Sequence, residues 1–241
     1  MNISRKKFVV ICCIAVIFFF ASILLFFHGG YLQKIISKIA PSKQISFQPK
    51  YDNKELDAWN NCLDQLHIDS DIVFFGDSIT RRGNFSEYFP DKTICNLGLG
   101  SDTILGMIER VSMIESVSPD IVFIMGGINS LRNDTLEQSI EEYKSLIDQI
   151  CEMKSSNIFI LSVLPVSKEI SESLPCSPET IISFNRSISA IAESKNLKYI
   201  DLYSLFVSSE GYIKPEFTTD GVHLTDNAYQ LFEDTISPFI N

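Results

Sequence analysis

The sequence is poor in the residues from which metal centres and nucleic-acid surfaces are built. It holds three histidines and no pair of cysteines at CxxC spacing, so a zinc site is not expected. Basic residues are outnumbered, because 20 lysines and arginines stand against 30 aspartates and glutamates, a net charge of −10. Such a surface repels nucleic acid, which we therefore exclude as a partner. No repeat at a solenoid period occurs, which excludes a repeat architecture.

A charge-free apolar run stands near the N-terminus. Residues 8–27 (FVVICCIAVIFFFASILLFF) contain no charged residue and follow three basic residues at positions 5–7. As a helix, a run of this length spans about 30 Å, the thickness of the hydrocarbon core of a bilayer. A cleavable signal peptide is the alternative, but the segment after Phe27 (HGGY) makes a poor cleavage site. We favour an uncleaved signal anchor that forms one transmembrane helix.

The basic residues before this run predict its orientation. Residues 1–7 should stay in the cytoplasm, and everything after residue 27 should be exported to the periplasm or the cell exterior. The exported part carries 17 basic and 30 acidic residues, a net charge of −13, so the helix and not electrostatics would bring the protein to a membrane. Residues 28–56 are expected to form a stalk. Residues 57–241 are long enough for one globular domain with its own core.

The six cysteines divide between the apolar run and the exported part: Cys12 and Cys13, then Cys62, Cys95, Cys151 and Cys176. A disulfide is chemically allowed in the exported part. The spacing leaves the pairing of these four open.

Short apolar runs alternate with helical patterns along the exported part. Five runs are typical of strands buried on both faces: residues 71–75, 93–97, 121–125, 158–164 and 197–202. Apolar side chains recur at helical spacing in three other segments: residues 104–114, 136–150 and 226–240. Ser177 and Pro178 suit the start of a further helix, and Asn133 or Asp134 can cap the second segment. This order predicts an α/β/α sandwich with a mostly parallel five-stranded sheet.

Ser78 follows the first of the predicted strands, at the edge of the sheet where ligands bind in such folds. In the segment Gly76-Asp77-Ser78, the glycine allows a sharp turn, so that the serine lies at a strand-to-helix junction. Its hydroxyl would then point into the crevice. Taken alone, such a triplet is more often a helix cap than a nucleophile.

A serine hydroxyl needs a base to become a nucleophile, and the sequence offers one good candidate. His28 abuts the apolar run and His67 precedes the first strand, so both are best interpreted as structural or surface residues. His223 stands before the last helix, with Asp220 three residues ahead of it. A carboxylate there can bind imidazole Nδ1, so that Nε2 faces the serine. A helix-capping turn built on Asp220 or Asp226 is the alternative, and it leaves the histidine unexplained.

Two other strand ends carry the polar, glycine-flanked groups that an oxyanion site requires. Residues 96–103 (NLGLGSDT) follow the second strand and place backbone amides before a helix. Residues 126–130 (GGINS) follow the third strand, where Asn129 offers a side-chain amide. A plain βα turn and an Asx-type loop are the alternatives. With Ser78, three strand ends together favour an acyl-transfer site.

These segments resemble the blocks of the SGNH hydrolases, also called GDSL-type esterases, and the resemblance covers roughly residues 70–241. The four blocks are Gly76-Asp77-Ser78-Ile79, residues 96–103, Gly127-Ile128-Asn129 and residues 220–223 (DGVH), in the order of the family. The sequence departs from the family at three positions: isoleucine replaces leucine at 79, serine replaces the last glycine of the second block at 101, and serine replaces aspartate at 130.

The resemblance implies a flavodoxin-like fold and a serine esterase that needs no metal or cofactor. Ser78 would be the nucleophile, His223 the general base and Asp220 the residue that orients it. The backbone N–H groups of Ser78 and Ser101 and the side chain of Asn129 would form the oxyanion hole. A backbone N–H survives the change from glycine to Ser101, although a left-handed backbone there would cost more.

The implied substrate is a small-molecule or glycan ester, from which the protein would remove an acetyl or another small acyl group. An O-acyltransferase that acts on sugar hydroxyls would use the same residues, and a non-catalytic exported binding module is a third reading. Arg81 and Arg82 follow the nucleophile and could contact an acidic substrate, although a solvated pair is the simpler interpretation. The acyl length and the oligomeric state stay open.

Overall fold

The computed structural model describes residues 69–153, 157–173 and 176–240. The predicted cytoplasmic segment, membrane helix and stalk (residues 1–56) lie outside these residues, as do His67 and Cys62. In the described ranges, no helix is both long and apolar enough to cross a bilayer.

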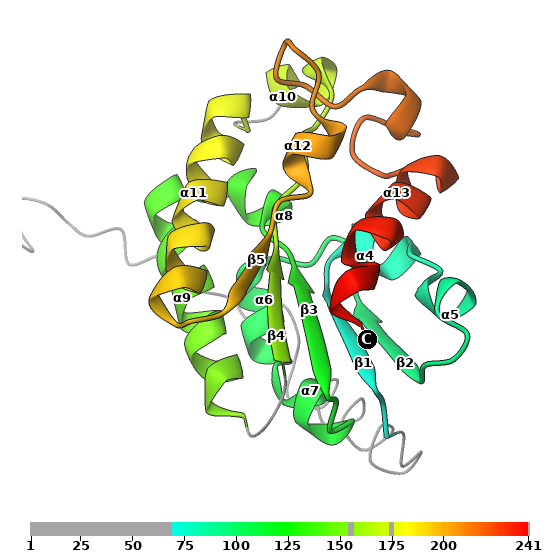
Figure 1. Ribbon diagram of the computed structural model, residues 1–241. Helices are drawn as coiled ribbons and strands as arrows, with labels where there is room; N and C mark the ends of the chain where they lie inside the picture. Colours follow the sequence, from blue (N-terminus) through cyan, green and yellow to red (C-terminus); the bar gives the residue numbers. More distant parts are fainter. Residues whose placement is uncertain (1–68, 154–156, 174–175, 241) are drawn as a thin grey trace, which may run out of the picture. The chain divides into compact units, whose positions relative to one another are not determined.

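Five parallel strands form a single sheet, as predicted (Figure 1). The strands are β1 (Ile72–Gly76), β2 (Ile94–Gly98), β3 (Ile121–Met125), β4 (Asn157–Leu161) and β5 (Lys198–Ile200). Their order across the sheet is β2-β1-β3-β4-β5. The sheet is therefore extended from β1 to one side by β2 and to the other side by β3, β4 and β5. The strand order changes direction between β1 and β3, and the carboxyl ends of these two strands flank a crevice of the kind that binds ligands.

Helices connect the strands and cover both faces of the sheet. The helices that follow β1 and β2 are α4 (Ser78–Arg82), α5 (Phe85–Tyr88), α6 (Ile104–Glu109) and α7 (Ser112–Ser116). Those that follow β3 and β4 are α8 (Ile128–Leu131), α9 (Leu136–Glu152), α10 (Lys168–Ser173) and α11 (Pro178–Ser194). The chain continues after β5 with α12 (Tyr203–Phe206), the 3₁₀ turn η1 (Pro215–Phe217), α13 (Asp226–Ile236) and the turn η2 (Ser237–Phe239).

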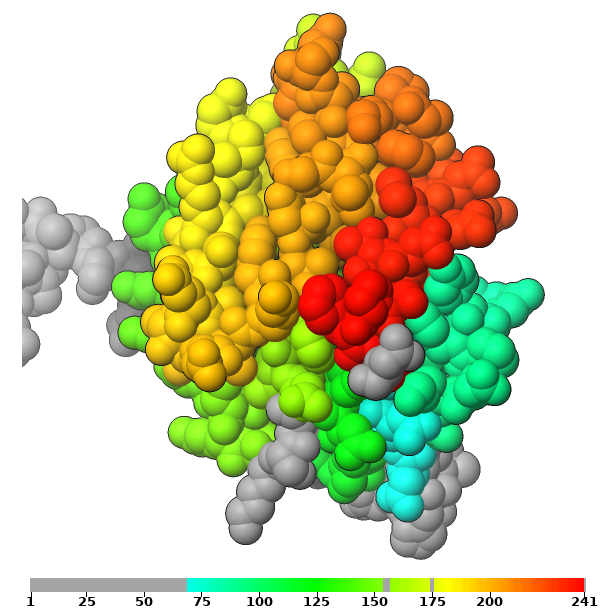
Figure 2. Space-filling view, in the orientation of Figure 1, coloured from blue at the N-terminus to red at the C-terminus, as the bar shows by residue number. Residues whose placement is uncertain are grey.

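Apolar side chains form two cores, one on each face of the sheet, because side chains alternate along each strand. In β1, Val73 and Phe75 pack with α6, α8, α9 and α11, whereas Ile72 and Phe74 pack with α4, α5, α12 and α13. All four side chains are at most 1% exposed. On the face seen in Figure 2, the red α13 and η2 cover the sheet between the teal segment of α5 and the yellow-orange segment of β5. The predicted sandwich of helices around a sheet is confirmed.

β4 and β5 end earlier than the apolar runs predict, because side chains take over the backbone hydrogen bonds. The amide of Asn185 binds both the N–H and the carbonyl of Val163, each at 2.8 Å. The hydroxyl of Ser162 accepts the N–H groups of Leu202 and Tyr203, at 2.9 and 2.7 Å. These bonds replace strand pairing beyond Leu161 and Ile200, and the apolar residues that follow line the core as loops.

The helix caps were predicted with mixed success. Ser177 caps α11 as expected, since its side chain accepts the N–H of Thr180 and a proline follows at the first helical position. The predicted caps of α9, Asn133 and Asp134, are wrong. Thr135 caps that helix and accepts the N–H of Gln138 at 3.2 Å.

Cys95, Cys151 and Cys176 are free thiols, and no disulfide joins any two of these three described cysteines. Burial raises the pKa of all three thiols, that of Cys176 to about 11. A thiol is nucleophilic only as the thiolate, so these cysteines are weak nucleophiles at neutral pH.

A buried ion pair joins the ends of β1 and β2 to the loop that follows β2. Arg110, 2% exposed, binds the fully buried carboxylate of Asp102 at 2.7 Å between Nε and Oδ2. Its two terminal nitrogens donate to the carbonyls of Leu97 and Gly76, at 2.7 and 2.9 Å. The guanidinium also lies 4.3 Å from the ring centroid of Phe75. A buried charge needs this degree of compensation.

Arg110 also explains why residues 104–114 are two helices and not the single helix that their spacing predicts. Its backbone leaves helical geometry, with φ −116° and ψ 17°, where its side chain reaches beneath the strand ends. The helix α6 stops there and α7 starts anew. Periodicity of apolar residues does not report such a break, because both short helices keep the same apolar side toward the core.

Replacing Arg110 by methionine should lower the free energy of unfolding by about 3–5 kcal/mol, because the change leaves Asp102 as an uncompensated buried charge. Denaturant unfolding followed by circular dichroism measures this loss. Arg186→Met is the matched control, since Arg186 is exposed on α11, and we expect a change within about 0.5 kcal/mol. Equal stability of the two variants would show that the buried pair does not anchor the strand ends.

Candidate active site

Ser78 is the first residue of α4, directly after β1. The triplet does cap this helix, but through Asp77, whose carboxylate accepts the N–H of Ile79 at 3.0 Å, and not through the side chain of Ser78. Gly76 is required by close packing, because a Cβ there would lie 2.1 Å from the carbonyl oxygen of Met125. The serine hydroxyl is left to face the carboxyl edge of the sheet.

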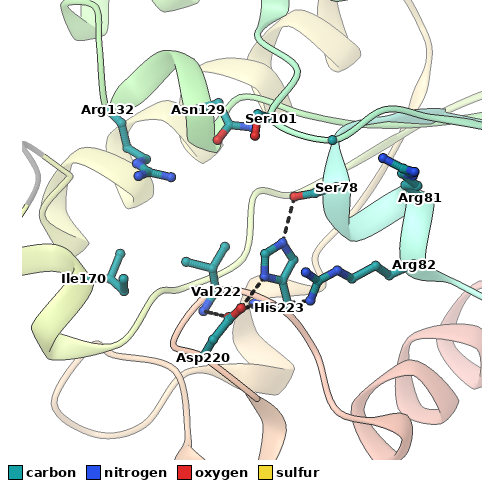
Figure 3. Close-up of a pocket in the computed structure, with 11 residues that line it drawn as sticks. Ser78, Arg81, Arg82, Ser101, Asn129, Arg132, Ile170, Asp220, Val222 and His223 are labelled. Carbon is teal, nitrogen blue, oxygen red and sulfur yellow. Dashed lines mark hydrogen bonds and ion pairs between the residues drawn. The ribbon is translucent and has the colours of Figure 1, made fainter.

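The fold brings His223 to Ser78 across 145 positions of sequence (Figure 3). Its Nε2 lies 2.9 Å from the hydroxyl oxygen of Ser78, and its Nδ1 lies 2.6 Å from Oδ2 of Asp220. A carboxylate on Nδ1 fixes the imidazole tautomer in which Nε2 is free to accept a proton. The three side chains therefore have the order and reach of an acid, a base and a nucleophile.

A tight loop between Thr218 and Leu224, whose ends form a β-bridge, sets the geometry of the Asp220–His223 pair. The second carboxylate oxygen of Asp220 accepts the N–H groups of Val222 and His223, at 3.1 and 2.8 Å. Thr218 closes the loop, since its hydroxyl donates to the carbonyl of His223 and accepts the N–H of Gly221. Gly221 has φ +90°, and a Cβ there would lie 2.5 Å from the hydroxyl oxygen of Ser167. Only glycine fits this position.

The pKa of Asp220 reflects these contacts. Partial burial alone would raise this pKa, but the hydrogen bonds from His223 and Val222 outweigh it and lower the pKa to about 2. The carboxylate is therefore ionised at any pH at which the imidazole can act as a base. Arg82 adds a distant positive charge, with Nη1 at 4.0 Å from Oδ2 of Asp220.

Tyr229 fixes the position of the histidine loop against the serine helix. Its hydroxyl donates to the carbonyl of Ile79 at 2.6 Å, and this bond joins α13 to α4 in the core. Tyr229 is 9% exposed and Ile79 is 4% exposed. Because α13 starts three residues after His223, this contact holds the imidazole in register with Ser78.

Asn129 lies in α8, just after β3, and its side-chain amide nitrogen donates to the carbonyl of Asp102 at 2.8 Å. An amide nitrogen has two hydrogens, so one remains for a second acceptor. Asp102 is the residue that Arg110 holds, and the side chain of Ser130, fully buried, accepts the N–H of Ile104 at 2.9 Å. The serine that replaces the expected aspartate at 130 therefore has a structural function.

Ser101 adopts the left-handed backbone conformation that we expected to be costly for a residue other than glycine, with φ +58°. A side chain in this region costs about 1–2 kcal/mol relative to glycine. Ser101 nonetheless lies at the cavity, next to Gly100. The loop that follows β2 thus keeps the turn that a glycine would give, despite the substitution.

A cavity of about 610 Å³ unites these residues. All five residues predicted from the sequence line it: Ser78, Ser101, Asn129, Asp220 and His223. Arg81 and Arg82 also line it, and so do three residues that the sequence reasoning missed: Arg132, Ile170 and Val222. Arg132 stands three residues after the third block, so its position shortly after a strand end could have marked it as a candidate. Ile170 belongs to the long connection after β4, where no pattern marks it.

No metal-binding group of three or more histidine, cysteine, aspartate or glutamate side chains occurs within residues 69–153, 157–173 and 176–240.

Comparison with known proteins gives relatives at low identity. The chain is 24% identical to platelet-activating factor acetylhydrolase IB subunit alpha2 of Rattus norvegicus over 180 residues, 69% of this chain and 74% of the relative. A GDSL-like lipase from Bacteroides thetaiotaomicron superposes with a TM-score of 0.65 at 21% identity, over 77% of this chain and 96% of that one. The acetyl xylan esterase AlAXEase gives 0.58 at 20% identity, over 70% and 99%. These two likenesses establish the fold.

The model of the GDSL-like lipase/acylhydrolase family matches residues 74–231, which run from β1 through most of α13 and include every residue discussed at the cavity. Because this match covers more than half of the sequence, the chain belongs to the GDSL-like lipase/acylhydrolase family and is an esterase of that family.

Proposed function

We propose that the protein hydrolyses carboxylic esters with small acyl groups, using Ser78 as nucleophile, His223 as general base and Asp220 as the residue that orients it. The observation that carries this proposal is the continuous path from Asp220 through the imidazole to the Ser78 hydroxyl, with steps of 2.6 and 2.9 Å. The path ends at a cavity large enough for a small ester.

The reaction has two halves. His223 Nε2 takes the proton from Ser78 as the hydroxyl oxygen attacks the ester carbonyl carbon, and then gives that proton to the leaving alcohol. Water next attacks the acyl-serine, again losing a proton to His223, and the carboxylic acid leaves. The ionised Asp220, with its pKa of about 2, stabilises the imidazolium that forms in each half.

Three donors are proposed for the oxyanion: the backbone N–H groups of Ser78 and Ser101 and the second N–H of Asn129. Ser78 is the first residue of α4, so its N–H takes no part in the hydrogen bonds of that helix. Asn129 is held by the carbonyl of Asp102, and fixed donors of this kind lower the barrier without reorganising during the reaction.

The acyl group that suits the cavity best is acetyl. Ile170 and Val222 supply a small apolar surface in a cavity whose other named side chains are polar. The names of two similar proteins, an acetylhydrolase and an acetyl xylan esterase, support the same acyl group. We therefore propose an acetyl ester of a small molecule or of a glycan as the substrate.

A fluorophosphonate probe should modify Ser78 and no other serine. Ser78→Ala should abolish labelling, and His223→Ala should slow hydrolysis of p-nitrophenyl acetate by a factor on the order of 10⁴ to 10⁶, because the hydroxyl loses its base. Peptide mapping of the labelled protein identifies the site. Ser86→Ala, exposed on α5, is the control and should label at the wild-type rate. Labelling of another serine would refute the assignment.

Asp220→Asn should lower kcat for p-nitrophenyl acetate by about 10³ to 10⁴. Asparagine keeps an oxygen that can accept the backbone N–H groups of Val222 and His223, so the loop is preserved. Its NH₂ group would face Nδ1 and favour the tautomer with the hydrogen on Nε2, which cannot take the serine proton. Steady-state kinetics measure the effect, and a decrease of less than tenfold would remove Asp220 from its proposed role.

We also propose that residues 8–27 anchor the protein in a membrane by a single helix, with the esterase domain exported. The support is the sequence alone: an uncharged run of bilayer length behind three basic residues. Alkaline carbonate should leave the full chain in the membrane pellet, and protease added outside should digest residues 57–241. Release of the full chain by carbonate would contradict the anchor.

A further inference from the structure

The charge of the cavity is opposite to that of the whole chain. Among the described lining residues, the charged side chains besides the histidine are Arg81, Arg82, Arg132 and Asp220. With the histidine neutral they sum to +2, whereas the chain carries −10. Positive side chains around a concave site concentrate the field there and attract an anionic ligand.

Arg132 is the most informative of these residues. It follows α8 and is half-buried, yet none of the described carboxylates lies within 4.0 Å of its guanidinium. Arg110 shows how this chain treats a buried guanidinium, since a carboxylate and two carbonyls surround it. A partly desolvated guanidinium without such partners is suited to bind an acceptor from a ligand.

The other two arginines are placed differently. Arg82 lies 4.0 Å from Asp220, and Arg81 lies against Gly100, where a Cβ would be 3.2 Å from its Nη1. Both are exposed, in agreement with a solvated pair, although both line the cavity. In Figure 3 they lie on one side of the Ser78–His223 hydrogen bond, and Arg132 lies on the other side with Ile170.

We propose that the natural substrate is an ester whose alcohol part carries a carboxylate or phosphate group, and that Arg132 binds this anion. The proposal rests on the proposed esterase function. Because the acyl group is small, the anion has to belong to the alcohol. A guanidinium binds carboxylate and phosphate oxygens through two parallel N–H groups, which gives the substrate one orientation as well as affinity. Arg81 and Arg82 contribute charge at the opposite end of the cavity.

The test compares esters of the same size that differ in charge. The full chain in detergent is assayed with 3- and 4-acetoxybenzoate and with the two matching acetoxybenzamides, which have the same size and no charge. We expect the wild-type kcat/KM to be about tenfold or more higher for the acids than for the amides. Arg132→Gln should reduce this acid-to-amide ratio by about tenfold, and Arg132→Lys should restore part of it.

Arg186→Gln is the matched control, because Arg186 is exposed on α11 and does not line the cavity, and its acid-to-amide ratio should equal that of the wild type. Circular dichroism establishes that each variant is folded.

Two further pairs of esters distinguish the source of the anion. The first pair is an O-acetylated methyl galacturonoside and the corresponding galactoside, and the second is 1-acetylglycerol 3-phosphate and 1-acetylglycerol. If the enzyme prefers the charged member of the first pair, the anionic group of the substrate is a sugar carboxylate. If it prefers the charged member of the second pair, the anionic group is a phosphate.

The outcomes separate the two proposals. Anion recognition would be overturned if the wild type cleaved the acetyl ester of the acetoxybenzamides at least as fast as that of the acetoxybenzoates. It would also be overturned if Arg132→Gln left the acid-to-amide ratio of kcat/KM unchanged. Either result would leave the esterase function standing. If the wild type hydrolyses none of these esters and does not react with the fluorophosphonate probe, the proposed triad itself is wrong.

Discussion

The site depends on one buried cation. Arg110 holds the carbonyl of Gly76, two residues before Ser78, and the carboxylate of Asp102, whose own carbonyl orients the amide of Asn129. The turn that carries Ser78, the proposed nucleophile, and the side chain proposed for the oxyanion are therefore fixed to the same guanidinium. A site must be held within fractions of an ångström to stabilise a transition state, and a guanidinium with three hydrogen bonds between strand ends is a rigid way to achieve this. A neutral residue of equal size would fill the space and leave these groups unbound.

The histidine side of the site is built by a different principle. Asp220 and His223 are three residues apart, and hydrogen bonds within their own loop fix the geometry of the pair. The imidazole must also lie near Ser78. The hydrogen bond from the Tyr229 hydroxyl to the Ile79 carbonyl places it there, because this bond fixes α13 against α4. The loss of chain entropy is smaller for a preformed local pair than for three separately positioned side chains.

This division explains what the sequence could predict. The Asp220–His223 pair and the strand-end position of Ser78 are local patterns, so spacing and apolar runs were enough to mark each of them, and the resemblance to the SGNH hydrolases implied that they act together. The helix break at Arg110, the early end of β4 at the Asn185 amide and the presence of Ile170 in the cavity arise from contacts between segments distant in the chain. Periodicity carries no record of such contacts. Ser101 lies between these two cases. The sequence shows that serine replaces the glycine of the family, whereas only the structure shows that the backbone keeps a positive φ there.

The net negative charge of the chain does not prevent its positive cavity from binding an anionic ester. At physiological ionic strength the Debye length is about 8 Å, so the net charge of −10 is felt weakly by a ligand that approaches from solution. Inside the cavity, screening by salt is weaker, and the half-buried Arg132 acts at hydrogen-bond distance. Short-range guanidinium contacts therefore decide which ester is bound, while the acidic surface repels extended polyanions whose charges lie outside the cavity. By this reasoning, the preferred substrate carries one anionic group close to its ester, and not a dense line of charges.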